Sequence, residues 1–435
     1  MDQLTIISIV CIVLLLVLLF SGMNIGLAML LVGFIGYAWV RNFDAAITML
    51  CTAPFSNAAN YNFSVIPLFT LMGCFAFASG LSQGLFDVGN KWLGWLPGGL
   101  ACATVAACAG FGAICGSAAA TAATMGTVAI PEMRRHGYQD RLSCGCVAAG
   151  GTLGILIPPS TCFILYGVSS ETSIGALFAA GVIPGIILTL IFIATIAFLV
   201  KRNPDIAPKS ASFTWRERFA SLKGVIGVVI LFAFVIGGLF AGWFTANEAA
   251  AMGAFMAFIF MFINKKMSWK NLFGALKDTV KTFSMVYVIL IGAGVFGNFL
   301  AVSQLPSRLS DFVVGLDVSK YVILAFIVLV YAFLGCIMDG LAMVLLTVPI
   351  FLPIVLQLGF DPIYFGVVIV LVSQLGLITP PVGLSAYVIA GVAKDVPLPT
   401  IFRGIVPFVF GLLLCVVLVT AFPILSTWLP SLLYP

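Results

Sequence analysis

Apolar stretches long enough to cross a bilayer recur along nearly the whole chain, with short polar turns between them. Two of these stretches, 98–133 and 320–358, are interrupted midway by small or polar residues, and we expect each to form a re-entrant hairpin. Because about 20 apolar residues suffice for a spanning helix, the pattern predicts an all-α integral membrane protein with about ten spanning helices. They are expected near 3–21, 24–40, 63–82, 142–168, 174–200, 224–242, 246–263, 282–302, 364–392 and 400–428.

The lysines and arginines indicate how these helices are oriented. With the N-terminus outside, only Arg41, Arg308 and Lys320 of the 20 basic residues fall on the periplasmic side. Cytoplasmic loops carry an excess of Lys and Arg, so this bias predicts periplasmic N- and C-termini. Counting either hairpin as a full span would destroy the bias, which independently favours the re-entrant interpretation.

The segment 264–281 has the pattern of a helix that lies along the cytoplasmic membrane surface, with an ordinary solvated helix as the alternative. An apolar stripe and a basic stripe occupy different faces of it. The apolar stripe is Trp269, Leu272, Phe273, Leu276 and Val280, and the basic stripe is Lys266, Lys270, Lys277 and Lys281.

A shift of 222 residues brings two parts of the sequence into register without a gap. The matched pairs include Phe111 with Phe333, Pro131 with Pro353, Gly154 with Gly376, and Pro158–Pro159 with Pro380–Pro381. In the predicted topology the first hairpin opens inward and the second outward, so the repeats are inverted. Inverted repeats with broken helices at matching positions point to the binding site of a transporter.

The repeats divide the chain into four expected regions. Residues 1–97 form N-terminal scaffold helices, and 98–200 form the first repeat with its hairpin (98–133) and broken helix (142–168). Residues 201–281 form a cytoplasmic basic loop, a scaffold helix pair and the interfacial arm helix. Residues 282–435 form the second repeat with its hairpin (320–358) and broken helix (364–392).

Four places in the repeats combine glycine, proline and small polar residues at membrane depth: the hairpin turns at 110–121 and 335–343 and the helix breaks at 151–160 and 376–385. Proline removes a backbone donor and displaces the preceding carbonyl from helical pairing. Unpaired carbonyls at half-helix ends suit a hard cation such as sodium, whereas free N–H groups at half-helix starts suit an anion. Each hairpin tip facing its broken helix therefore predicts a sodium site, with the substrate anion between the two sites.

The residues at these places are the candidate ligands. We expect the first sodium site to be formed by Gly116, Ser117, Gly154, Ile157 and Pro159, and the second by Asp339, Gly340, Gly376, Thr379 and Pro381. The candidate substrate-binding residues are Ser117, Thr121, Ser160, Gly383 and Ser385. Apart from coupling sodium ions, no organic cofactor is expected.

Asp339 is the only acidic residue in the middle of a membrane-depth segment. An ionised carboxylate is costly there, so intramembrane acids usually have a function. Three roles are open: a cation ligand or an orienter of ligands, a proton carrier, and an N-cap of the second half of the hairpin. Ser117, at the matching position of the first repeat, is either a hydroxyl ligand or an N-cap, and Thr379 has the same two alternatives.

Composition supports the membrane assignment and excludes other classes. Of the 435 residues 62% are hydrophobic and 8% charged, whereas about a quarter of a soluble domain is charged. The formal net charge of +5 comes from basic residues scattered between apolar segments, which argues against a nucleic-acid partner. His136 is the lone histidine and the 11 cysteines lack metal-binding spacing, so nothing predicts an enzyme active site.

At its hairpins and breaks the sequence resembles the large membrane subunit of tripartite ATP-independent periplasmic (TRAP) transporters. The motifs follow the family's order over nearly the whole chain, and the hairpin tips and Pro-Pro breaks are also similar to the wider ion transporter superfamily. The matching motifs are Gly116–Thr121, Ile130–Tyr138, Ile157–Ser160, Ala180–Gly185, Thr245–Glu248, Met338–Gly340 and Thr379–Gly383.

The resemblance implies a scaffold and a moving elevator domain that carries both hairpins. It implies sodium-coupled uptake of a carboxylate or sulfonate across the bacterial inner membrane. It also implies a four-helix small membrane subunit, expected as a separate polypeptide, and a periplasmic substrate-binding protein. The alternative is a self-sufficient sodium- or proton-coupled dicarboxylate carrier of the same superfamily. Sialic acid, C4-dicarboxylates, other carboxylates and sulfonates are all open as substrates, because selection in this family rests largely with the binding protein.

Overall fold

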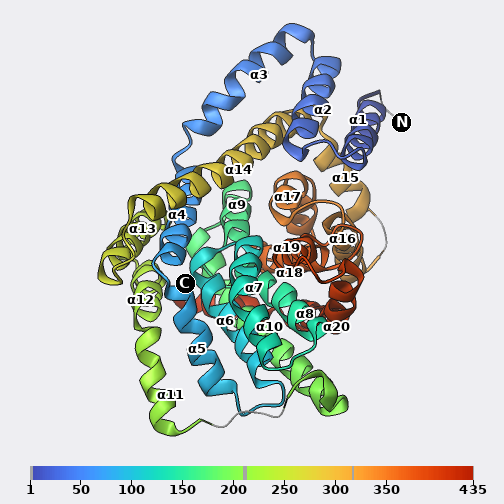
Figure 1. Cartoon of the computed structure of the whole chain (residues 1–435). Coiled ribbons are helices and arrows are strands. Elements are labelled where there is room, and N and C mark those ends of the chain that lie inside the picture. The colour runs from blue at the N-terminus through green and yellow to red at the C-terminus, as the bar shows by residue number, and fades with distance from the viewer. Residues whose placement is uncertain (1–2, 209–212, 316–317, 435) are drawn as a thin grey trace.

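Helices form every regular element of the part of the chain that the structure describes, which is residues 3–208, 213–315 and 318–434. The computed structural model has 21 α-helices and four short 3-10 helices there, which confirms the predicted all-α class (Figure 1). Seven of these helices are long and apolar enough to span a bilayer, or eight if the bent pair Trp215–Gly224 and Ile226–Phe240 is one span. This number is lower than the expected ten partly because the structure divides some expected spans, such as 142–168 and 364–392, into two shorter helices at their breaks.

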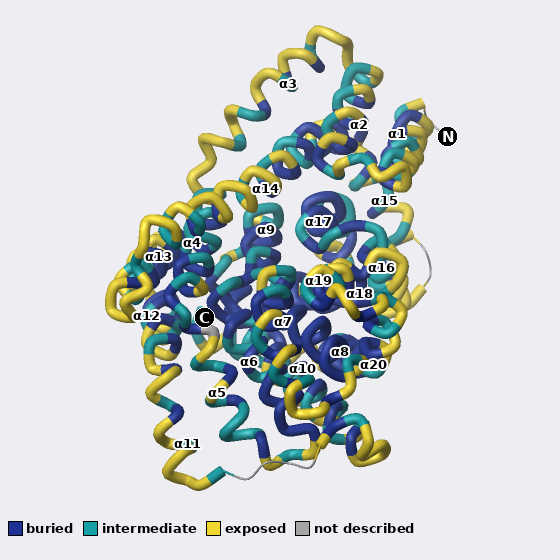
Figure 2. Tube along the Cα trace, viewed as in Figure 1, coloured by how far each residue is buried: buried dark blue, intermediate teal, exposed yellow. Residues whose placement is uncertain are grey.

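The N-terminal region contains more helices than the sequence pattern predicts. Helices α1 (Gln3–Phe20), α2 (Ile25–Val40) and α4 (Val65–Ala78) lie where they were expected, but α3 (Phe43–Ala58) and α5 (Leu81–Leu93) were not predicted. Both are too short and too polar to register in a search for spanning stretches. Helix α3 projects away from the other helices, and most of its surface is exposed (Figures 1 and 2).

One long helix, α14 (Trp269–Ser303), runs beside α2 and α4. The prediction that an interfacial helix ends at 281 and a spanning helix starts at 282 is therefore wrong: the helix continues without interruption, because no proline or glycine lies at the junction. In its N-terminal part the apolar stripe, including Trp269, Phe273 and Val280, is exposed, as a membrane-surface location would require.

Glycine allows α14 to approach α2 closely. A Cβ atom on Gly292 would lie 2.1 Å from the carbonyl oxygen of Gly26, and one on Gly26 would lie 2.6 Å from that of Val288. Small residues at such crossings let membrane helices pack backbone to backbone. The remaining helices of this side are α11 (Trp215–Ser221), α12 (Ile226–Phe240) and α13 (Ala246–Ile263).

Helix α13 begins with a capping box. The Thr245 hydroxyl accepts from the backbone N–H of Glu248, and the Glu248 carboxylate accepts from the backbone N–H of Thr245 at 2.8 Å. The motif Thr245–Glu248 thus fixes the start of a helix that packs on α4 and α12.

The two repeats form the rest of the molecule. The first contains α6 (Gly99–Cys115), α7 (Ala118–Arg135), α8 (Asp140–Thr152), α9 (Thr161–Ser169) and α10 (Ile174–Arg202). The second contains α15 (Leu305–Val314), α16 (Lys320–Gly335), α17 (Gly340–Gln357), α18 (Pro362–Ile378), α19 (Leu384–Val392), α20 (Leu398–Ala421) and α21 (Ile424–Leu433). Helix α15 was not predicted. The predicted helix 400–428 is divided in two just before Pro423, which has no backbone N–H to continue it.

Helix α18 lies at the centre of the molecule. Every residue from Tyr364 to Ile378 is buried, and the helix is surrounded by α8, α9, α10, α16, α17 and α20 (Figure 2). It therefore packs against helices of both repeats, which brings the two predicted sites into one core.

Candidate functional site

The first hairpin turns within two residues. Helix α6 ends at Cys115, Gly116 adopts a left-handed conformation with φ +64°, and Ser117 then begins α7. The N–H of Gly116 donates to the Gly112 carbonyl at 2.9 Å, and the Ser117 hydroxyl accepts from the N–H of Ala120. The left-handed conformation explains why glycine occupies position 116.

The first broken helix opens between α8 and α9. After α8 comes a short 3-10 turn, Leu153–Ile155, and the backbone then stays non-helical until Ser160. Ser160 caps α9: its hydroxyl accepts from the N–H of Phe163 at 3.3 Å and donates to the carbonyl of Ile155. The break predicted at 151–160 is therefore present, and the Pro158–Pro159 pair lies inside it.

This break receives the tip of the first hairpin. The backbone N–H and the hydroxyl of Thr161 both donate to the Gly116 carbonyl, at 3.3 and 2.9 Å. A Cβ atom on Gly116 would lie 2.6 Å from the Pro159 carbonyl oxygen, and one on Gly154 would lie 2.9 Å from the Ser117 carbonyl oxygen. Each element thus places a backbone carbonyl against a glycine of the other, where a side chain would have no room.

Ile157 lies differently. Its side chain packs on α10, where a Cβ atom on Gly185 would lie 2.7 Å from the Ile157 Cγ1. Its backbone N–H donates to the Leu153 carbonyl at 3.0 Å. Any contribution of Ile157 to a cation site would therefore come from its backbone.

The second hairpin has a longer turn, from Cys336 to Asp339. The Asp339 carboxylate caps α17 by accepting from the N–H of Ala342 at 2.8 Å. This is one of the three roles that the sequence left open for Asp339. Ser117 caps α7 in the same way at the matching position of the first repeat.

The second break is also present, between α18 and α19. Thr379 ends α18 and donates its hydroxyl to the Leu375 carbonyl at 2.7 Å, and Gly383, with φ +52°, begins α19. A Cβ atom on Gly376 would lie 2.0 Å from the carbonyl of Gly335, and the Cys336 thiol lies 3.2 Å from the Thr379 hydroxyl. Gly376 and Thr379 thus meet the end of α16.

Asp339 and Gly340 lie on another side of the hairpin tip. A Cβ atom on Gly340 would lie 3.3 Å from the hydroxyl of Ser373 and 3.5 Å from the thiol of Cys162. The start of α17 therefore packs between α18 and α9. Since the neighbouring Thr161 binds the first hairpin tip, both hairpins contact the first turn of α9.

The two breaks differ in exposure. Pro158 and Pro159 are buried, whereas Pro380, Pro381 and Val382 are exposed. The first break is thus closed over by surrounding helices, and the second is accessible from outside the protein. Pro381, a predicted sodium ligand, lies on this accessible side.

The candidate substrate residues also separate into two kinds. The hydroxyls of Thr121 and Ser160 are buried and donate to backbone carbonyls in their own hairpin or break. The Ser385 hydroxyl, on the first turn of α19, is 1% exposed and has no hydrogen-bond partner in the described part of the chain. Of these three hydroxyls, that of Ser385 is the one left unpaired by the described residues.

Gln374 was not predicted as a site residue. It lies in the centre of α18 with 0% exposure, and neither its amide oxygen nor its amide nitrogen has a hydrogen-bond partner among the described residues. Leaving such groups buried and unpaired costs about 1–3 kcal/mol each. The signal available in the sequence was a lone amide inside an apolar run that leads directly into the second break.

The described residues contain no group of three or more His, Cys, Asp or Glu side chains that could hold a metal ion. A cation at either break would therefore depend on backbone carbonyls and hydroxyls, with Asp339 as the one nearby carboxylate. A separate cavity of about 640 Å³ lies away from the breaks, where Asn60, Glu171, Thr245 and Tyr434 contribute to its lining.

Comparison with known proteins shows which family the chain resembles. Residues 12–425 match the family described as tripartite ATP-independent periplasmic transporter, DctM component. The C4-dicarboxylate TRAP transporter large permease protein DctM of Pseudomonas aeruginosa is 36% identical over 399 residues, which cover 89% of this chain and 93% of that protein. The sialic acid TRAP transporter large permease protein SiaM of Vibrio cholerae is 33% identical, with 95% and 96% covered.

A longer relative is the isethionate TRAP transporter permease protein DctMQ of Oleidesulfovibrio alaskensis, which is 34% identical. The match covers 85% of this chain but only 58% of that protein. Among solved structures, the YdaH transporter of Alcanivorax borkumensis has a similar fold, with a TM-score of 0.62 at 17% identity over 87% of this chain and 89% of that one.

Proposed function

The chain belongs to the DctM component family of tripartite ATP-independent periplasmic transporters, and we propose that it carries out sodium-coupled uptake of a small organic anion across the bacterial inner membrane. It is a multi-pass membrane transport subunit. In the proposal its substrate crosses the membrane unchanged, so no enzymatic step is involved.

The observation that carries the proposal is the meeting of each hairpin with a broken helix. At the first break the Pro159 carbonyl lies against Gly116 and the Ser117 carbonyl against Gly154, and at the second Gly376 and Thr379 meet the end of α16. Carbonyl oxygens and hydroxyls in a poorly hydrated space suit a sodium ion. Two such sites, related by the repeat, supply the coupling ions.

The first turn of α9 supports a substrate position between the two sites. It contacts the first hairpin through Thr161 and the second through Cys162. The start of α19, with the unpaired hydroxyl of Ser385, supplies a second half-helix N-terminus, which favours an anion. The related permeases are named for C4-dicarboxylates, sialic acid and isethionate, which supports a carboxylate or sulfonate here.

The proposed movement is of the elevator type. Helix α14 packs on α2 and α4, and α4 packs on α13. In the proposal these four helices are the scaffold, and the hairpins and broken helices around α18 are the moving unit. In the proposed orientation both termini are periplasmic, and a small four-helix membrane subunit and a periplasmic binding protein complete the transporter.

The test is uptake into proteoliposomes that contain the complete transporter. We expect uptake of the organic anion to collapse when external sodium is replaced by choline or potassium. A matched preparation with an imposed proton gradient and no sodium serves as the control. Undiminished uptake in that control would exclude sodium coupling.

A further inference from the structure

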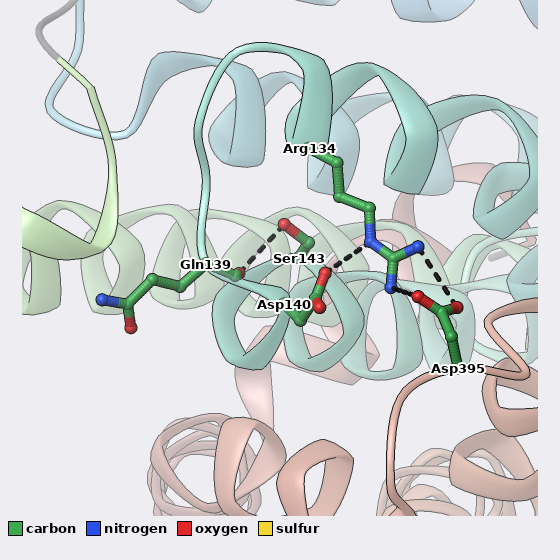
Figure 3. A network of polar contacts seen from close by, with 5 residues as sticks. All are labelled: Arg134, Gln139, Asp140, Ser143 and Asp395. Carbon is green, nitrogen blue, oxygen red and sulfur yellow. Dashed lines mark hydrogen bonds and ion pairs between the residues drawn. The ribbon is translucent and has the colours of Figure 1, made fainter.

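A cluster of three charged side chains joins the two repeats (Figure 3). Arg134 lies in the last turn of α7, Asp140 in the first turn of α8, and Asp395 in the loop that follows α19. The Arg134 Nε lies 2.5 Å from the Asp140 carboxylate. Its Nη2 lies 2.8 Å and its Nη1 3.2 Å from the two carboxylate oxygens of Asp395.

The geometry uses the particular shape of arginine. Nη1 donates a hydrogen bond to Asp395, Nη2 makes an ion-pair contact with the same carboxylate, and Nε donates to Asp140, an arrangement that a lysine ammonium cannot reproduce. The guanidinium holds the pKa of the Asp395 carboxyl below its ordinary value, so the pair is charged at neutral pH. The Arg134 side chain is 32% exposed and that of Asp395 68%, so the pair is weaker than a buried one.

The helix that precedes Asp395 packs on α7. A Cβ atom on Gly126 of α7 would lie 3.1 Å from the Ile389 Cδ1 and 3.4 Å from the Val392 Cγ1, both on α19. Helix α19 has only nine residues, and helices shorter than about 12–15 residues depend on tertiary contacts for their stability. Its other end leads out of the exposed Pro380–Val382 segment, which has few buried contacts to hold it.

A second attachment lies further along the same connection. The Arg141 Nε donates to the Arg403 carbonyl at 3.2 Å. A Cβ atom on Gly404 of α20 would lie 1.9 Å from the carbonyl oxygen of Arg141 on α8. The start of α20 is thus fixed to the first repeat by backbone packing, and the end of α19 by the ion pair of Asp395.

We propose that Arg134 is a positioning residue for the second break: by binding Asp395 it holds α19 on α7, so that the first repeat fixes the geometry of the site formed by the second. The effect of Arg134 on transport rests on the proposed sodium-coupled function. The effect of Arg134 on how firmly α19 is held does not. Arg134 itself contacts neither break.

Four variants test this proposal. Asp395→Asn keeps the side-chain size but removes the charge, and Arg134→Asp replaces attraction by repulsion. The double variant Arg134→Asp with Asp395→Arg restores opposite charges at these two positions. Arg135→Asp is the control, because it makes the same charge change in the same turn on a side chain that is 81% exposed.

The first measurement is hydrogen–deuterium exchange of the purified protein. We expect amides of α19 to exchange about fivefold faster in Asp395→Asn and Arg134→Asp, in line with a partly exposed ion pair. Helix α9, the matching half-helix, should exchange as in the wild type, and the double variant and Arg135→Asp should also match the wild type. Unchanged exchange of α19, or an equal rise in α9, would overturn the proposal.

The second measurement is uptake by the complete transporter at different sodium concentrations. We expect the sodium concentration for half-maximal uptake to rise about fivefold in the single variants, with little change in maximal rate and recovery in the double variant. A loss of maximal rate with unchanged sodium dependence would contradict a positioning role at the second break. Wild-type uptake without sodium would refute the proposed function, while the exchange measurement would still decide the role of Arg134.

Discussion

Ser117 and Asp339 occupy matching positions in the two hairpins, and each begins the second helix of its hairpin. One cap is a neutral hydroxyl and the other a carboxylate, so the same local geometry is combined with different charge. The sequence predicted capping as one role among several for both residues, and the structure confirms the capping geometry. A ligand role for the Asp339 charge stays a prediction.

Replacing Asp339 by Asn separates these roles. Asn caps helices about as well as Asp, so folding and expression should be kept. The loss of a full negative charge at the tip of the second hairpin should weaken sodium activation roughly 10- to 100-fold, or about 1.4–3 kcal/mol. The measurement is the sodium dependence of uptake by the reconstituted transporter.

Two variants serve as controls for this experiment. Asp361→Asn removes the charge of another acidic cap, at the exposed start of α18, and should leave sodium activation unchanged. Ser117→Ala should have a smaller effect than Asp339→Asn, because it removes only a dipole. If Asp339→Asn keeps the wild-type sodium dependence, the residue is only a cap. If it abolishes a pH dependence present in the wild type, a proton carrier is the better description.

At the scale of elements, the hairpins and breaks were predictable because proline and glycine interrupt long apolar runs at a fixed spacing in both repeats. Helices α3, α5 and α15 were not, because short and less apolar helices lack a spanning signal. The burial of Gln374 could not be predicted either, since it depends on which helices surround α18. Nor does periodicity reveal which side of α17 faces α9.

The close approach of α16 and α18 provides a test of the second site as an element pair. In Gly376→Ala the new Cβ atom would lie 2.0 Å from the Gly335 carbonyl, which is backbone and cannot rotate away. We expect the free energy of unfolding to fall by about 1–3 kcal/mol, as in other overpacked cores, and the midpoint of thermal unfolding in detergent to fall with it.

Gly391→Ala is the matched control, because Gly391 lies in α19 with no atom within 4 Å of its added Cβ. This variant should unfold at or above the wild-type temperature, since alanine favours the helix. If Gly376→Ala leaves thermal stability and sodium activation unchanged, then neither of them needs the close approach of the hairpin to the break.

At the scale of the whole molecule, the sequence predicted two inverted repeats, and the structure adds how they are joined. The fully buried α18 contacts helices of both repeats, and Arg134 reaches Asp395 across 261 positions of the chain. Such contacts have no local signature, because each partner alone is an ordinary charged residue in a turn. The division of the chain into a fixed scaffold and a moving unit stays a prediction.

The family to which the chain belongs is tripartite, and this predicts that uptake depends on two further components. The match covers only 58% of the DctMQ relative, so that permease carries substantial sequence in addition to the matched part. We expect this chain, reconstituted alone, to take up organic anion no faster than protein-free liposomes. Addition of the small membrane subunit and the substrate-loaded periplasmic protein together should produce sodium-dependent uptake, whereas either one alone should not. A preparation with a binding protein from an unrelated transporter controls for non-specific effects. Full-rate uptake by the chain alone would instead establish a self-sufficient carrier of the same fold.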